Sequence, residues 1–153
     1  MSCYVIRSAG PGDIDTLVSQ ARDFVGEAPN LDTESFRPSK VKDALIEATA
    51  SGFVFVAERE GDGAIVGWVA GGAARPWWGA ELVLDDLALY VVPEERAKPR
   101  GCAIALVAAM ENWGVERGIE HAEPGVTSGS TAALRLYERL GYQVVGYRLR
   151  RKL

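Results

Sequence analysis

The sequence predicts a mixed α/β fold, and two observations carry that prediction. Segments with strand and helix patterns follow one another as β-α-α-β-β-β-α-β-α-β along 153 residues, an order typical of a mixed sheet covered by helices. The central strands follow one another directly, which favours an antiparallel meander. A chain of this length and ordinary composition can bury a core as a single domain over residues 1–153.

The first third of the chain is expected to form a strand and two helices. Cys3 to Arg7 is a short β-type run that ends in the turn residues 9–12, and Asp13 then caps a helix. That helix carries apolar residues at helical spacing: Ile14, Leu17, Val18, Ala21 and Val25. A second helix, capped by Ser39, follows the loop 26–38 and has its own apolar face: Val41, Ala44, Leu45 and Ala48.

The middle of the chain is expected to form three strands. Residues 53–59 and 64–73 are β-type runs joined across Gly61-Asp62-Gly63, which is a strong hairpin signal. A loop rich in aromatic surface, residues 75–79, leads to the next strand at residues 82–92. Pro93 ends that strand because proline cannot donate to a sheet ladder.

The last third is expected to alternate helix and strand. A helix from about residue 101 to 117 buries several apolar side chains: Ala103, Leu106, Val107, Met110 and Trp113. Residues 119–126 form a strand, and a fourth helix follows with an inner face of four residues: Ala133, Leu136, Tyr137 and Leu140. Gly141 closes that helix, and residues 142–149 form a final strand before a basic tail.

Composition excludes several classes of protein. No apolar run is long enough to span a bilayer, and the N-terminus lacks the features of a signal peptide, so we expect a cytoplasmic protein without a membrane partner. Two cysteines, Cys3 and Cys102, and the single His121 are too few for a Cys/His metal site, so no metal is expected. The net charge of -4 argues against nucleic acid as a partner.

The segment from Leu82 to Trp113 has the features of an anion site. It runs from an apolar strand through a basic turn into a helix whose first residues are small. Unpaired N–H groups and the helix dipole favour an anion at such a terminus. Gly101 and Ala103 leave room for a phosphate, while Lys98 and Arg100 can add charge-assisted hydrogen bonds. Taken alone, the pattern also fits a plain connection between strand and helix.

Two segments together resemble a known family. Residues 90–114, YVVPEERAKPRGCAIALVAAMENWG, resemble motif A of the GNAT N-acetyltransferase superfamily, and residues 132–142, AALRLYERLGY, resemble its motif B. The resemblance implies a mostly antiparallel, twisted sheet with a splayed parallel strand pair and about four flanking helices. It also implies acetyl-CoA as cosubstrate and transfer of an acetyl group directly to a primary amine of a small molecule or peptide.

The resemblance also implies site residues. In this family the basic turn binds the coenzyme A pyrophosphate, which here points to seven residues: Lys98, Pro99, Arg100, Gly101, Cys102, Ala103 and Ile104. The backbone of the preceding strand holds the acetyl and pantetheine arm, which corresponds to Leu89, Tyr90 and Val91. A motif B tyrosine near the sulfur, here Tyr137, is the general acid. The chain departs from the usual pattern at Lys98, where arginine or glutamine is common, and at Ser130, where asparagine is common.

A general base is predicted in the central strand. Asp85 and Asp86 interrupt an apolar run, and a carboxylate on the cleft side of a strand can have a raised pKa. Strict alternation places Asp86, Ala88 and Tyr90 on one face. We therefore rank Asp86 first, with Asp85 and Glu81 as alternatives. The competing interpretations are a solvated strand residue for Asp86 and a core tyrosine for Tyr137.

Other interpretations stay open at this level. Cys102 sits at a helix N-terminus beside two cations, where a lowered thiol pKa would suit a nucleophile. The loops 26–38 and 75–79 are expected to determine which acceptor binds. Many members of the family form homodimers. The alternative to an enzyme is a GNAT-like module that binds acyl-CoA as a sensor or interaction partner with little transferase activity.

Overall fold

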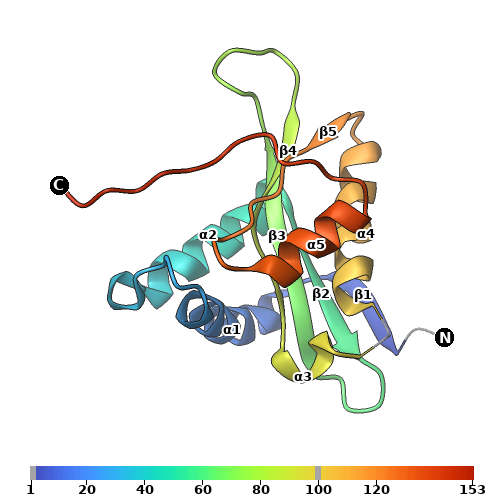
Figure 1. Cartoon of the computed structure of the whole chain (residues 1–153). Helices are drawn as coiled ribbons and strands as arrows, with labels where there is room; N and C mark the ends of the chain where they lie inside the picture. Colours follow the sequence, from blue (N-terminus) through green and yellow to red (C-terminus); the bar gives the residue numbers. More distant parts are fainter. Residues whose placement is uncertain (1–2, 99–100) are drawn as a thin grey trace.

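One mixed sheet organises the molecule. The computed structural model describes residues 3–98 and 101–153, and its sheet has the strand order β1-β2-β3-β4-β5 (Figure 1). The strands are β1 (Tyr4–Ser8), β2 (Phe53–Arg59), β3 (Ile65–Ala74), β4 (Val83–Val91) and β5 (His121–Ala122). The first four pair antiparallel, and β5 pairs parallel to β4. The predicted mixed α/β class and the antiparallel meander are confirmed.

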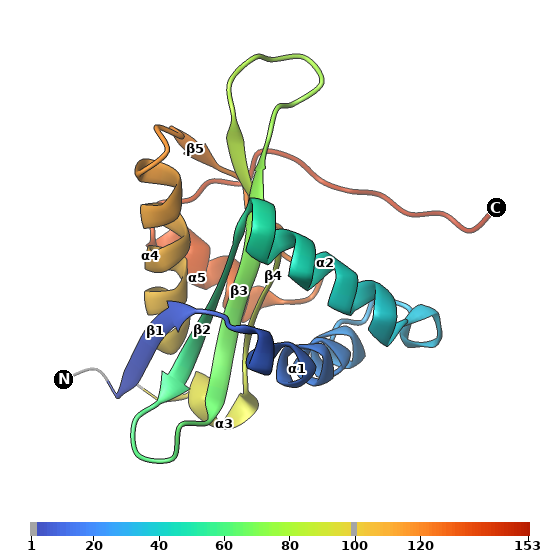
Figure 2. The same ribbon diagram turned by 180° about the vertical axis from the view of Figure 1, so that it is seen from behind.

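Helices cover both faces of this sheet. They are α1 (Ile14–Glu27), α2 (Pro38–Ser51), the single turn α3 (Pro93–Arg96), α4 (Cys102–Val115) and α5 (Thr131–Arg139). Two short 3-10 turns, η1 (Pro11–Asp13) and η2 (Thr33–Ser35), precede α1 and α2. Helices α1 and α2 lie on one side of the sheet and α4 and α5 on the other (Figures 1 and 2).

The two faces of the sheet carry separate hydrophobic cores. On the α1/α2 face, Leu17 and Leu45 pack with Trp68 and Tyr90. The α4/α5 face buries a second set: Phe53, Val69, Leu84, Leu106, Val107, Met110 and Tyr137. Because successive side chains of a strand point to opposite faces, the face of each β4 residue decides which core and which helices it meets.

A β-bulge in β4 changes that assignment for Asp86. Ala88 pairs with Ala70 and Asp86 pairs with Gly71, so Leu87 is an extra residue without a partner in β3. The alternation therefore reverses at Leu87. Leu84 and Asp86 lie on the α4/α5 face, whereas Ala88 and Tyr90 belong to the core under α1 and α2. The prediction that Asp86 shares a face with Tyr90 is wrong, because it assumed a regular strand.

Two predicted strands differ from the structure. Of residues 119–126, only His121 and Ala122 pair, and the segment bends away at Pro124 and Gly125. Residues 142–149 form no strand and continue into an extended, exposed tail. Within residues 3–98 and 101–153, no helix combines the length and apolarity needed to cross a bilayer.

Candidate active site at the splay of β4 and β5

The site begins where β4 and β5 separate. The two strands pair only through Val83 with His121 and Leu84 with Ala122, and the Glu123 N–H donates to the Leu84 carbonyl at 2.8 Å. One step further, Asp86 Oδ1 replaces a backbone carbonyl and accepts from the Gly125 N–H at 2.8 Å. Past this point no strand of the described chain pairs with β4 on its β5 side. The implied splayed parallel pair is confirmed.

Asp86 is a half-buried carboxylate with one oxygen unpaired. Its Oδ2 is buried and has no hydrogen-bond partner among the described residues. Burial and the neighbouring charge of Asp85 raise the pKa of Asp86 to about 6, although the Gly125 N–H opposes the shift. A carboxylate with this pKa is a stronger base than an ordinary aspartate and is still ionised at neutral pH.

Tyr137 presents a second unpaired polar atom on the same face of the sheet. The residue is buried in the α4/α5 core, and its Oη has no hydrogen-bond partner in the described part of the chain. Burial is the main cause that raises the pKa of Tyr137, and the negative charge of Asp86 is the next. The phenol therefore stays protonated at neutral pH, as a group that is to donate a proton must.

Two residues that sequence reasoning missed support Tyr137. Tyr142 packs edge-on against it, with ring centroids 5.0 Å apart. The Tyr142 hydroxyl donates to Glu111 Oε1 on α4 at 2.7 Å, which fixes the ring. Position 142 belongs to the motif B resemblance, but the partnership with Glu111 depends on how α4 packs and has no sequence signal.

The start of α4 has the geometry of an anion site. Gly101 is the N-cap residue in a left-handed conformation, with φ 68° and ψ 34°, which other residues adopt only with strain. The first N–H groups of a helix have no partner within it, and here they belong to Cys102, Ala103 and Ile104. Gly101 and Ala103 are half-buried and Ile104 is exposed, so the terminus is accessible. Pro99 and Arg100 lie outside the described residues.

Lys98 is engaged by a buried carboxylate. Its Nζ donates to Glu95 Oε1 at 2.7 Å, and Glu95 also accepts from Arg59 at 3.0 Å and from the Tyr4 hydroxyl at 2.6 Å. These partners, with Lys98 first, lower the pKa of Glu95 to about 2. Glu95 thus anchors the turn between β4 and α4 to β1 and β2. Sequence reasoning missed it, because nothing local distinguishes it from the exposed Glu94.

The three predicted strand residues have different surroundings. Leu89 is half-buried on the α4/α5 face, while the Tyr90 ring is buried on the α1/α2 face. Arg96 Nε donates to the Val91 carbonyl at 2.6 Å, and its guanidinium lies 5.3 Å from the centre of the Tyr90 ring. The Val91 carbonyl therefore already accepts a hydrogen bond from Arg96, at the end of β4.

Cys102 does not have the properties of a nucleophile. The thiol is buried, and a Cβ added to Gly67 would lie 3.2 Å from its sulfur, so the side chain points at β3. Burial and the charge of Glu95 raise its pKa to about 11. The prediction of a lowered thiol pKa is wrong, because the side chain turns into the core while only the backbone faces the turn.

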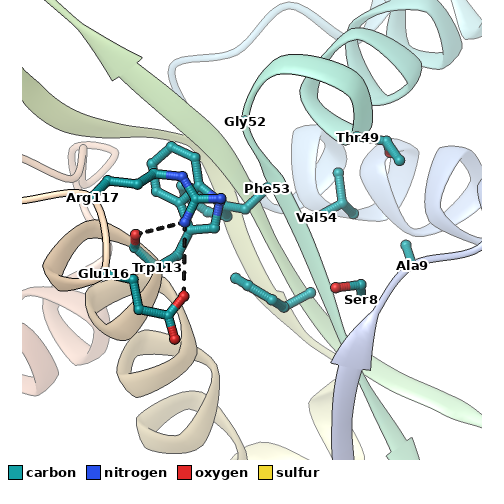
Figure 3. A pocket seen from close by; sticks show the side chains of 10 residues that line it. Ser8, Ala9, Thr49, Gly52, Phe53, Val54, Trp113, Glu116 and Arg117 are labelled. Atoms are coloured by element: carbon teal, nitrogen blue, oxygen red, sulfur yellow. Dashed lines mark hydrogen bonds and ion pairs between the residues drawn. The ribbon is translucent and has the colours of Figure 1, made fainter.

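The hollow shown in Figure 3 lies apart from these residues. It encloses about 340 Å³ between β1, β2 and the last turn of α4, and none of the predicted site residues lines it. Its charged wall is internally paired: Arg117 lies 4.0 Å from the Trp113 ring centre and donates to the Trp113 carbonyl at 3.0 Å. Among the described residues, no cluster of His, Cys, Asp and Glu could hold a metal ion.

Comparison with known proteins supports the family resemblance. Residues 19–142 match the model of the Acetyltransferase (GNAT) family. An L-methionine sulfoximine/L-methionine sulfone acetyltransferase from Pseudomonas paraeruginosa is 25% identical over 142 residues, which cover 92% of this chain and 81% of the relative. Its counterpart from Pseudomonas aeruginosa is 24% identical with the same coverage.

Solved structures share the fold. A putative acetyl transferase from Pyrococcus furiosus superposes with a TM-score of 0.76 at 19% identity, covering 98% of this chain and 99% of the other. Aminoglycoside N-acetyltransferase AAC(6')-Iy in complex with CoA superposes with a TM-score of 0.70 at 19% identity, covering 98% of this chain and 97% of the other.

Proposed function

Because this chain belongs to the Acetyltransferase (GNAT) family and is thereby an acetyl-CoA-dependent N-acetyltransferase, we propose that it acetylates a primary amine of a small molecule by direct transfer. One observation carries the catalytic assignment. The two unpaired polar atoms described above, Asp86 Oδ2 and Tyr137 Oη, belong to residues on the same face of the sheet, and the charge of Asp86 acts on the Tyr137 hydroxyl. A buried polar atom without a partner is costly, so two such atoms on one face of the sheet point to a bound group.

The two residues have complementary roles. Asp86 takes a proton from the amine, directly or through water, so that the nitrogen lone pair can attack the thioester carbonyl carbon. As the new C–N bond forms and the C–S bond breaks, Tyr137 donates its phenolic proton to the departing sulfur. The products are an acetamide and the coenzyme A thiol. The proton taken by Asp86 leaves to solvent and Tyr137 is reprotonated, which balances the cycle.

We assign acetyl-CoA binding to the strand edge and the turn that follows it. The first N–H groups of α4, at Cys102, Ala103 and Ile104, suit the pyrophosphate, with Gly101 leaving the approach open. Lys98 would contribute its charge from its position beside Glu95. The predicted contacts of Pro99 and Arg100 with coenzyme A remain a prediction, because these two residues lie outside the described part of the chain. The unpaired edge of β4 near Leu89 and Tyr90 suits the amide groups of the pantetheine arm. At Val91 only the N–H group is available to that arm, because Arg96 already donates to the Val91 carbonyl.

The named relatives support a proposal for the class of acceptor. They acetylate L-methionine sulfoximine and L-methionine sulfone, so we propose a small amino-acid-like amine as acceptor. Trp77 and Trp78, in the loop between β3 and β4, are largely exposed and available to contact it. We further propose that residues 1–153 act as one domain in the cytoplasm.

The test is a coenzyme A release assay with a panel of amines that includes both methionine derivatives, together with a thermal shift on acetyl-CoA. We expect stabilisation by acetyl-CoA and release of the thiol with at least one amino-acid-like amine. Stabilisation without release over the whole panel would instead identify an acyl-CoA-binding module. The absence of any stabilisation by acetyl-CoA or coenzyme A would contradict the binding site itself.

A further inference from the structure

The end of α5 brings a second aromatic ring onto Tyr137. Gly141 has φ 94°, in the left-handed region that glycine adopts without strain. The Gly141 N–H donates to the Glu138 carbonyl and the Tyr142 N–H donates to the Tyr137 carbonyl, both at 3.0 Å. These two bonds form a Schellman motif, which commonly brings together the two side chains that here are Tyr137 and Tyr142. The rings meet edge-on, at an interplanar angle of 72°.

The hydroxyl group of Tyr142 is tied to a different helix. It donates to Glu111 Oε1 on α4 at 2.7 Å, and both side chains are half-buried. Burial and this hydrogen bond raise the pKa of Tyr142, so the hydroxyl stays protonated as a donor at neutral pH. Hydrogen bonds to a carboxylate are stronger than those between neutral groups. Glu111 therefore restrains the Tyr142 ring, and that ring limits where Tyr137 can move.

The Tyr137 hydroxyl has no anchor of its own. It has no hydrogen-bond partner among the described residues, so packing alone sets the orientation of the phenol, and Tyr142 supplies part of that packing. A proton donor must lie within hydrogen-bond reach of the atom that it protonates, and a displacement of about 1 Å can cost about 10²-fold in rate. The orientation of the proposed acid thus depends on a neighbour that is anchored elsewhere.

Helix α4 carries both Glu111 and the assigned pyrophosphate site. Its free N–H groups begin at Cys102, and the helical rise per residue places Glu111 about 13 Å further along the axis. Fully buried side chains between these two positions fix the helix to the sheet: Leu106, Val107 and Met110. One rigid element therefore relates the end that would hold the phosphates to the residue that anchors Tyr142.

We propose that Glu111 and Tyr142 are positioning residues for the general acid Tyr137, an inference that rests on the proposed function. Glu111 anchors the Tyr142 hydroxyl to α4, and the Tyr142 ring keeps the Tyr137 phenol in the orientation that protonates the departing sulfur. The helix that binds the pyrophosphate thereby also sets the position of the proton donor relative to the cosubstrate.

Turnover of single variants tests this proposal on the full chain, with an amine accepted in the coenzyme A release panel. Tyr142→Phe and Glu111→Ala remove the anchor from its two sides. Each should lower kcat about tenfold, while the KM for acetyl-CoA and the thermal stabilisation by acetyl-CoA stay unchanged. Glu111→Gln, which retains an acceptor oxygen, should recover most of the lost rate. The control Glu116→Ala, which removes an exposed carboxylate at the end of α4, should match the wild type.

Combined variants separate this role from a general effect on folding. Glu111→Ala together with Tyr142→Phe should be no slower than either change alone, because both remove the same hydrogen bond. In a Tyr137→Phe background, Tyr142→Phe should have no further effect on kcat. Wild-type kcat in Tyr142→Phe, or an equal loss with and without the Tyr137 hydroxyl, would overturn the positioning role. Wild-type turnover by Tyr137→Phe alone would instead contradict the proposed general acid, so the two failures are distinguishable.

Discussion

Asp86 Oδ1 accepts a hydrogen bond from the Gly125 N–H at 2.8 Å, at the first position where β4 and β5 no longer pair. A side chain thereby takes the place of a ladder carbonyl. The consequence is twofold, because the bond holds the two strands at the start of their separation and fixes one carboxylate oxygen while the other remains free. The proposed base is thus one of the residues that fix where β4 and β5 separate.

Removing the phenolic hydroxyl should slow catalysis without disturbing the fold. Tyr137→Phe keeps the ring that packs on Tyr142 but removes the proton donor. We expect kcat to fall by about 10²-fold or more, with the KM for acetyl-CoA little changed, in a coenzyme A release assay. The control Tyr147→Phe, at an exposed position, should match the wild type. Wild-type turnover by Tyr137→Phe would remove Tyr137 from the mechanism.

The bulge in β4 should tolerate no side chain at Gly71. An added Cβ would overlap the Asp85 carbonyl oxygen and lie 2.8 Å from Asp86 Cα. We expect Gly71→Ala to lower the free energy of unfolding by about 1–3 kcal/mol and to reduce kcat, because Asp86 must move. At Gly72 the nearest atom to an added Cβ is 3.6 Å away, so Gly72→Ala is the control. Equal stability and activity of the two variants in urea unfolding and turnover would contradict this account.

The buried carboxylate of Glu95 should contribute stability that depends on pH. Its pKa is lowered from 4.5 to about 2, so its contribution is complete above pH 4.5 and is lost as the pH falls toward 2. Glu95→Gln should reduce the free energy of unfolding at neutral pH by about 2 kcal/mol and flatten the loss of stability at acid pH. The exposed neighbour provides the control Glu94→Gln, for which neither change is expected in denaturant melts recorded across this range.

The two thiols should differ in reactivity. Cys3 is half-buried, whereas Cys102 is buried and burial raises its pKa to about 11. Near neutral pH, a disulfide reagent should therefore modify Cys3 rapidly in the folded protein and reach Cys102 only after unfolding. Rapid modification of both thiols in the native state, followed by mass spectrometry, would show that Cys102 is accessible and reopen its nucleophilic role.

The sequence predicted the fold well where patterns are local. The hairpin at Gly61-Asp62-Gly63 and the helix after Gly101 follow from turn chemistry and apolar spacing, and the structure contains both. The choice of Tyr137 came from the motif B resemblance. Its burial and its free hydroxyl agree with that choice.

Other features could not be predicted, because they depend on contacts between distant segments. The bulge at Leu87 is set by the close approach of Gly71 on another strand, so alternation alone misplaced Asp86 relative to Tyr90. The burial of Glu95 depends on Tyr4 and Arg59, which lie far away in sequence. The strand expected at residues 142–149 is not formed, because this segment pairs with no strand among the described residues.

The pH dependence of kcat/KM tests the central claim, that Asp86 is the general base opposite Tyr137. With an accepted amine, the wild-type value should rise with pH through an apparent pKa of about 6, since the base must be ionised. Asp85→Asn should keep this rise and move it to slightly lower pH, because the charge of Asp85 raises the pKa of Asp86. We predict that Asp86→Asn loses the rise near pH 6 and is about 10²-fold slower at neutral pH. A wild-type profile in Asp86→Asn would contradict the account.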